Sequence, residues 1–214
     1  ELVYYESSGY APGQDLDVAD LTATPAQTDA FFAFAEANFG RLRQWLLRPD
    51  TAGPFRETDV LAVRGSTWSF LRYAADRLGG TQSTLWSNLA FSPDSGLTNL
   101  ASGLGTDPMP WFRDWAAAMY IDDAGAGTPA AIHTQPSWNF RDIYAALDYD
   151  PGPACSCAYQ LTVRNPTNGV ADSFSMSRSG AASYQLLGVA AGAFAGVTTT
   201  APGANLAITV IRRE

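Results

Sequence analysis

The residue types most often used in catalysis and metal binding are few in this chain and widely spaced. Its 214 residues include one histidine, His133, and two cysteines, Cys155 and Cys157, separated by one serine. A zinc-binding His-Glu-x-x-His helix needs two histidines, so the chain does not contain one. It also lacks the Gly-x-Ser-x-Gly turn that presents a nucleophilic serine, which disfavours a serine-hydrolase triad. We therefore expect no catalytic, cofactor-binding or metal-binding residue within the chain itself.

The single histidine and the cysteine pair each leave several interpretations open. His133 could act as a general base or a transition-state donor, but no motif places a partner beside it, which favours an ordinary loop residue. Cys155 and Cys157 could be reduced, could form a strained disulfide, or could pair with cysteines elsewhere in a longer protein. Two thiols alone do not complete a zinc site. In an exported protein an oxidised form is favoured over free thiols.

Composition restricts the class of protein and the kinds of partner. Hydrophobic residues make up 46% of the chain and charged residues 16%, which is typical of a chain that folds around a core. No apolar stretch approaches the roughly 20 residues of a membrane span. The net charge is −8, and the 13 basic residues are all arginines spread along the chain. This distribution disfavours nucleic acid as a partner, because no basic patch attracts a phosphate backbone.

The hydrophobic pattern changes near residue 125. Before this point apolar residues recur at spacings of three and four, which indicates helices with one buried face. Capping residues, prolines and glycines set the expected bounds of these helices at 24–48, 57–80, 81–89, 95–104 and 108–120. Gly40 should weaken the first of them in its middle. We expect residues 1–124 to form an all-α bundle of five or six helices with its aromatic side chains in the core.

The second part of the chain has the pattern of β-structure. Residues 125–150 combine a linker rich in Gly and Ala with one short helix, predicted at 139–147. Segments with strand-like composition follow at 158–163, 171–177, 182–188, 194–199 and 206–212, separated by turn residues. They predict an antiparallel sheet or small sandwich over 151–214. The expected fold class is therefore α+β with two domains, a helical lobe followed by a β-domain.

Charged residues within the predicted helix 57–80 have a simple structural interpretation. Arg72 and Asp76 are four residues apart, so they fit an ion pair on the surface of the helix. A pair of this kind stabilises a helix by about 0.2–0.5 kcal/mol and implies no function. Their presence alone does not indicate a site.

Several segments resemble the C-terminal helical lobe of gluzincin-type zinc metallopeptidases, and in particular the hyicolysin family of secreted bacterial endopeptidases. They are LAVRGSTWSFLRYAADRLGG at 61–80, GLTNLASGLGTDPMPWFRDWAAAMY at 96–120, QPSWNFR at 135–141 and the opening ELVYY. In that family the zinc helix and the glutamate ligand precede this lobe. The resemblance implies that the chain is the later part of a longer polypeptide, and that zinc is held by the preceding part.

The resemblance also implies positions for individual residues. Arg64 should border the active-site cleft, and Gly65 should allow close approach of another helix or of the zinc-bearing segment, with Trp68 filling the core of the lobe. Aminopeptidase-type gluzincins have a tyrosine three residues before this glycine, which stabilises the tetrahedral intermediate. This chain has Ala62 there, so that role is not transferred, while Tyr73 could face either way.

Two functions of different classes follow. The first is the non-catalytic C-terminal part of a secreted bacterial zinc metallopeptidase, whose partners are the upstream catalytic part and a peptide or protein substrate. The run SYQLLGVAAG at 183–192 resembles, weakly, the β-modules appended to such peptidases. The alternative is a free-standing extracellular or cell-surface binding module without enzymatic activity. Both place the protein outside the bacterial cytoplasm, in the periplasm, at the cell surface or in the medium.

Overall fold

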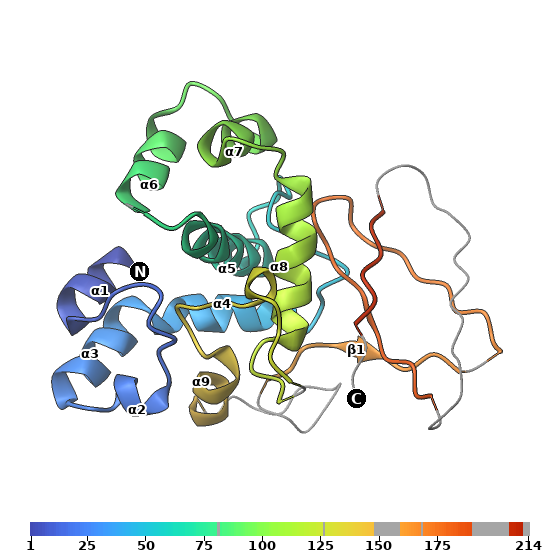
Figure 1. The fold of residues 1–214 in the computed structure, drawn as a ribbon, viewed down its shortest axis with the longest axis horizontal. Coiled ribbons are helices and arrows are strands. Elements are labelled where there is room, and N and C mark those ends of the chain that lie inside the picture. Colours follow the sequence, from blue (N-terminus) through green and yellow to red (C-terminus); the bar gives the residue numbers. More distant parts are fainter. Residues whose placement is uncertain (81, 126, 148–158, 168, 190–205, 212–214) are drawn as a thin grey trace.

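The regular structure of the described residues is mostly helical. The computed structural model describes residues 1–80, 82–125, 127–147, 159–167, 169–189 and 206–211. The helices are α1 (Leu2–Ser8), α2 (Val18–Leu21), α3 (Pro25–Phe34), α4 (Glu36–Leu46), α5 (Leu61–Leu78), α6 (Gln82–Phe91), α7 (Gly96–Leu104), α8 (Met109–Ile121) and α9 (Phe140–Ala146), with a 3₁₀ turn at η1 (Ala131–His133) (Figure 1). None of the described helices is both long and apolar enough to cross a membrane.

The core is built around the crossing of α4 and α5, the most extensive helix contact in the described residues. Phe39, Leu42 and Trp45 project from α4 and are fully buried. Trp45 packs on Trp115 of α8, with ring centroids 4.8 Å apart. Aromatic side chains supply large buried areas, so these contacts account for much of the apolar stabilisation of the lobe.

The predicted helix 24–48 is in fact two helices. Thr24 caps α3 by accepting a hydrogen bond from the Gln27 amide, as its sequence position indicates. The helix then breaks at Ala35, whose φ of −120° lies outside the helical range, rather than near Gly40. The break turns α3 relative to α4 and brings Phe31 within 5.4 Å of Phe39 between ring centroids. Tertiary packing therefore decides the position of the break, which no glycine or proline marks.

Other helix predictions differ in number and in detail. The structure describes eight helices before residue 125, where the sequence predicts five or six, because α1 and α2 precede the five predicted ranges and the range 24–48 contains two helices. Asp17 and Asp20 form a capping box that stabilises α2. Phe34, predicted to lie in the core, is 44% exposed at the end of α3.

The prediction of an antiparallel sheet is not met in the described residues. Their β-structure is one parallel pair of two-residue strands, β1 (Val163–Arg164) and β2 (Tyr184–Gln185). The segments 171–177 and 206–211 contain no strand, and the predicted strand 194–199 lies outside the described residues. The fold is therefore predominantly helical with a very small sheet, and only the broad α+β class is met.

The segment after residue 158 is extended, but it bonds mainly to the helical part of the chain. The Thr162 amide donates to the Leu46 carbonyl at 2.9 Å, and the Ser177 and Ala182 amides donate to the Asp50 and Pro49 carbonyls, each at 2.9 Å. Tyr159, Gln160 and Leu161 are buried in succession. Three consecutive buried residues do not fit a strand with one solvent face, which explains why alternation misled the prediction.

Candidate functional site

An open groove of about 510 Å³ runs along the first half of α5. One wall is the loop segment 56–59. The other wall is a face of α5, formed by Val63, Arg64, Thr67, Trp68 and Leu71. Its lining combines an apolar strip on the helix with charged groups on the loop, the mixture found in sites that bind peptides and small molecules.

The α5 wall is fixed by its packing against α4. Gly65 packs against α4, where a Cβ atom would overlap the backbone of Arg41 and Leu42. The absence of a side chain lets the two helices approach closely. The expected close approach of a helix at Gly65 is therefore present, and the partner is α4 of this same chain. On this support Arg64 is exposed, while Trp68 is half-buried and packs against the core, as the sequence predicted.

Trp68 forms part of the groove through its indole ring. The ring packs against Phe39 and Phe140, with centroids 5.3 and 5.9 Å away. Its Nε1 atom is buried and has no hydrogen-bond partner among the described residues. Fixed by these neighbours, the indole presents a rigid apolar surface to anything lying in the groove.

The loop wall is fixed by contacts of residues 53–55, which lead into it. Thr67 Oγ1 donates to the Pro54 carbonyl at 2.7 Å, which ties the loop to α5. Phe55 packs on Phe112 of α8, with ring centroids 4.7 Å apart. Gly53 lies against the backbone of Ser179, where a Cβ atom would overlap. Helices α5 and α8 and the C-terminal segment thus position the groove together.

Arg64 and Asp59 form a two-pronged ion pair across the mouth of the groove. Arg64 Nε and Nη2 donate to the two carboxylate oxygens of Asp59, each at 2.5 Å. The hydrogen bonds from Arg64 lower the pKa of Asp59, so the carboxylate is charged at neutral pH. Both side chains are more than half exposed, which limits the contribution of the pair to stability. The pair therefore orients Arg64 and leaves it accessible to a ligand.

The second Arg–Asp pair on α5 contradicts its prediction as a surface pair. Arg72 and Asp76 are 2.8 Å apart, and their side chains are only 1% and 2% exposed. The Ser137 hydroxyl donates to Asp76 Oδ1 at 2.9 Å. Helical spacing shows that two residues share a face but does not show whether another segment covers that face. Here residues 135–138 and α6 cover it.

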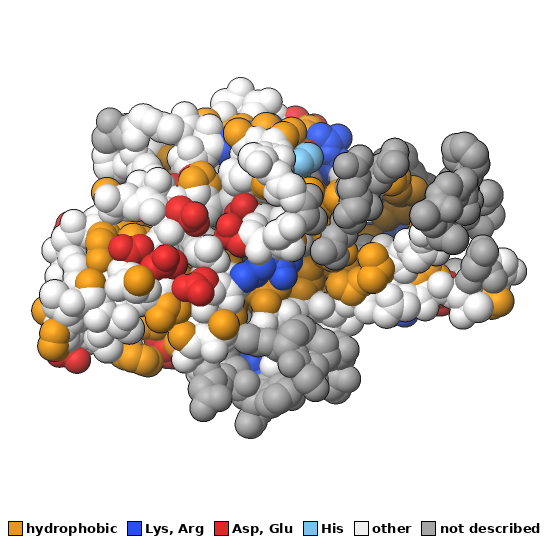
Figure 2. Space-filling view, turned by 60° about the horizontal axis from the view of Figure 1, so that its bottom comes forward, with side chains coloured by type: hydrophobic (Ala, Val, Ile, Leu, Met, Phe, Trp, Pro, Cys, Tyr) orange, Lys and Arg blue, Asp and Glu red, His pale blue; other side chains and the backbone are white. Residues whose placement is uncertain are grey.

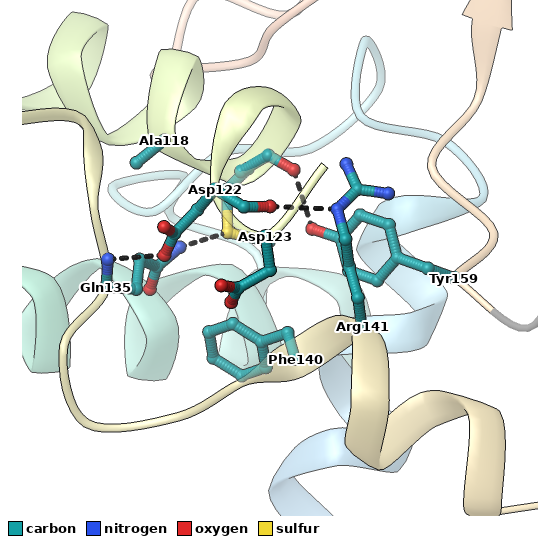
Figure 3. Close-up of a pocket in the computed structure, with 8 residues that line it drawn as sticks. Ala118, Asp122, Asp123, Gln135, Phe140, Arg141 and Tyr159 are labelled. Carbon is teal, nitrogen blue, oxygen red and sulfur yellow. Dashed lines mark hydrogen bonds between the residues drawn. The ribbon is translucent and has the colours of Figure 1, made fainter. Parts of the chain in front are cut away.

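A second cluster of charged groups lies where α8 ends (Figure 3). Asp122 accepts a hydrogen bond from the Gln135 amide at 2.6 Å, and its carbonyl accepts one from Arg141 Nε at 2.8 Å. Arg141 also lies over the ring of Tyr159, 4.5 Å from its centroid. The enclosed space is only about 10 Å³, roughly enough for one water molecule. This cluster of Asp122, Gln135, Arg141 and Tyr159, called the joint below, connects separate segments of the chain and is too small to hold a substrate.

Burial dominates the electrostatics of this joint. It raises the pKa of Asp122 to about 6, against the lowering effect of the Gln135 hydrogen bond. Burial and the charges of Asp123, Asp17 and Asp20 also raise the pKa of Asp15.

Figure 2 shows acidic side chains gathered on one face of the molecule, next to arginines. Within the described ranges, no group of three or more His, Cys, Asp or Glu residues could hold a metal ion.

The remaining residues singled out from the sequence lie away from the groove. His133 is half-buried at the end of η1 and lines neither the groove nor the joint. Tyr73 is buried and donates to the Ile132 carbonyl at 2.7 Å. Burial raises its pKa to about 12. The Cys155–Cys157 segment lies outside the described residues.

Of the residues that line the groove, only Arg64 was indicated by the sequence as a site residue. Glu57, Thr58 and Asp59 had the pattern of a helix start, but α5 begins at Leu61 and these residues form the loop wall instead. No sequence signal pointed to Asp59, because it precedes the helix and a spacing of five residues does not place two side chains on one helix face. Comparison of the chain with protein-family models, curated proteins and solved structures found no match.

Proposed function

We propose that this chain is the non-catalytic C-terminal lobe of a secreted bacterial zinc metallopeptidase, and that its groove forms part of the wall of the substrate cleft. The observation that carries the proposal is the arrangement of α5. Arg64 and Trp68 line an open groove, while Gly65 between them is packed against α4. The resemblance to gluzincin metallopeptidases, in which the corresponding segment borders the cleft, supports the same placement.

The chemistry of the groove suits an extended peptide. The half-buried side chains of Trp68 and Leu71 offer apolar surface for a substrate side chain. The guanidinium of Arg64 is exposed and can donate hydrogen bonds to peptide carbonyl groups or to a carboxylate. In this proposal the zinc and the groups that activate water belong to the upstream part of the polypeptide, and this chain orients the substrate.

A free-standing binding module is the second candidate, and one observation favours it. The close partner of Gly65 is α4 of this chain, so the close packing of this segment does not require an upstream domain. The same groove could then bind a peptide or protein outside the cell without cleaving it. Both candidates predict peptide binding, and only the first predicts proteolysis by a longer protein.

The test combines binding by this chain with activity of the full-length gene product. Calorimetric titration with heptapeptides that carry a central leucine or phenylalanine should show binding, weakened at least fivefold by Trp68→Ala and by Arg64→Ala. Arg48→Ala, which changes an exposed arginine outside the groove, should leave binding unchanged. In the full-length protein the same substitutions should raise KM. A full-length gene without an upstream His-Glu-x-x-His motif would reject the peptidase proposal and retain the binding module.

A further inference from the structure

Helices α6 and α7 form a hairpin that stands away from the rest of the helical lobe (Figure 1). Leu85, Leu100 and Leu104 are buried within it or at its base. A Cβ atom on Gly103 would lie 2.7 Å from the Leu89 side chain, so the two helices are closely packed. In the described residues, the main contact of this hairpin with other helices is that of α6 with α5. The hairpin is therefore a compact unit with a narrow base.

Both connections of this hairpin to the lobe contain glycines in conformations that other residues rarely adopt. Gly79 has φ 65° and ψ −169°, a region essentially restricted to glycine. Gly80 and Gly105 also have positive φ, at 71° and 69°. No atom lies within 4 Å of a Cβ placed at any of the three. Backbone rotation at these positions meets little steric resistance.

The base of the hairpin is polar where it faces α5. Gln82 Nε2 is 3.4 Å from Asp76 Oδ1, and the Trp86 ring centroid lies 5.9 Å from Arg72 Cζ. Several buried polar atoms here have no hydrogen-bond partner in the described part of the chain, namely Arg72 Nε and Nη1, Asp76 Oδ2, Gln82 Oε1 and Trp86 Nε1. They include donors and acceptors from both sides of one interface.

Such an interface resists separation less than an apolar one of the same size. Buried polar groups without partners carry a desolvation penalty, and water satisfies them when the two sides part. A buried ion pair likewise recovers its hydration on exposure. Separating α6 from α5 should therefore cost only a small free energy.

We propose that the α6–α7 hairpin, residues 82–104, is a flap that opens as a unit about Gly79, Gly80 and Gly105. Opening exposes the α6-facing side of Arg72 and Asp76. Positions 64, 68, 72 and 76 follow one another at intervals of four along a slowly turning stripe of α5. This stripe turns by about 120° between positions 64 and 76, so the flap covers the face of α5 on which Gly65 lies and not the groove lining itself. The inference stands independently of the proposed function.

Hydrogen exchange under native conditions, followed by mass spectrometry, tests the flap. Amides of α6 and α7 should exchange at one common rate, at least tenfold faster than the central amides of α4 and α5. Arg72 should react with phenylglyoxal at a rate that follows this opening. Equal protection of the hairpin and of α5 would overturn the proposal, and so would separate exchange rates for α6 and α7.

Substitutions at the interface test the role of the polar base. Arg72→Met combined with Asp76→Leu should slow exchange of the hairpin severalfold, because an apolar interface replaces a poorly bonded ionic one. Asp59→Leu with Arg64→Met alters the exposed pair between the loop wall and the start of α5, and it should leave exchange of the hairpin unchanged. If the first variant does not fold, Gln82→Leu with Trp86→Phe makes the same change from the flap side. Unchanged exchange in the folded variant refutes the role assigned to the polar base.

Discussion

Gly65 of α5 lies directly against the backbone of Leu42 in α4, with no space for a side chain between them. This contact connects the core of the lobe to the groove, since Arg64 precedes Gly65, Trp68 follows it three residues later, and both line the groove. A change at this one position should therefore affect stability and groove geometry together.

Replacing Gly65 with leucine should destabilise the chain by about 1–3 kcal/mol, through overpacking against the backbone of α4. The backbone has less freedom to move than a side chain, so the upper part of that range is expected. Urea denaturation of both proteins measures the difference. Gly188→Leu is the matched control, because a Cβ atom at Gly188 meets nothing within 4 Å. Equal stability of wild type and Gly65→Leu would contradict the close contact.

Arg72 and Asp76 should behave as a coupled buried pair. Replacing Arg72 alone with methionine leaves a buried carboxylate without its countercharge, which should reduce stability by about 3–5 kcal/mol. The double replacement Arg72→Met and Asp76→Leu removes both charges and should lie within about 1 kcal/mol of wild type or above it. Denaturation of the two single variants and the double variant gives the coupling energy. Additive effects of the two single changes would show that the pair is not coupled.

Asp122 should make stability fall as pH rises between about 4 and 6. Burial raises its pKa in the folded chain to about 6, from an ordinary value of 3.8. A raised folded-state pKa means that the folded chain binds the proton more tightly, so this stabilisation is complete below pH 3.8 and is lost as pH rises through 6. Partial exposure limits the effect to roughly 1–2 kcal/mol.

The variant Asp122→Asn isolates this contribution. Asparagine keeps an oxygen that can accept the hydrogen bond from the Gln135 amide but does not ionise. Its stability should depend less on pH between 4 and 6, and it should exceed the wild type at pH 7. Thermal denaturation at a series of pH values measures both curves. Parallel curves for the two proteins would show that Asp122 has an ordinary pKa.

The chain of 214 residues should neither bind stoichiometric zinc nor cleave protein by itself. Its one histidine lies outside the groove, while a catalytic zinc requires three protein ligands and an open position. Elemental analysis of the purified protein and a casein digestion assay with and without chelator check both parts. One tightly held zinc per chain, or proteolysis that a chelator abolishes, would reject this expectation.

The sequence by itself determined the local helical structure well. Thr24 before Pro25, the Gly79–Gly80 pair and Pro108–Met109–Pro110 lie at or next to the ends of α3, α5 and α8. These signals act within a few residues, because a cap or a proline affects only nearby backbone hydrogen bonds. Gly65 as a point of close approach also followed from the sequence, whereas the place of Arg64 beside an active-site cleft stays a prediction.

Only the tertiary structure decided which faces were covered and which segments met. The spacing of Arg72 and Asp76 places them on one face of α5, but distant residues 135–138 and α6 bury that face. The loop wall at 56–59 and the joint at Asp122 likewise depend on segments far apart in the chain. After residue 158, alternation suggested strands, yet the backbone bonds to helix ends and loops instead. Hydrogen-bond partners of an extended segment are set by what lies beside it in space, which local pattern does not encode.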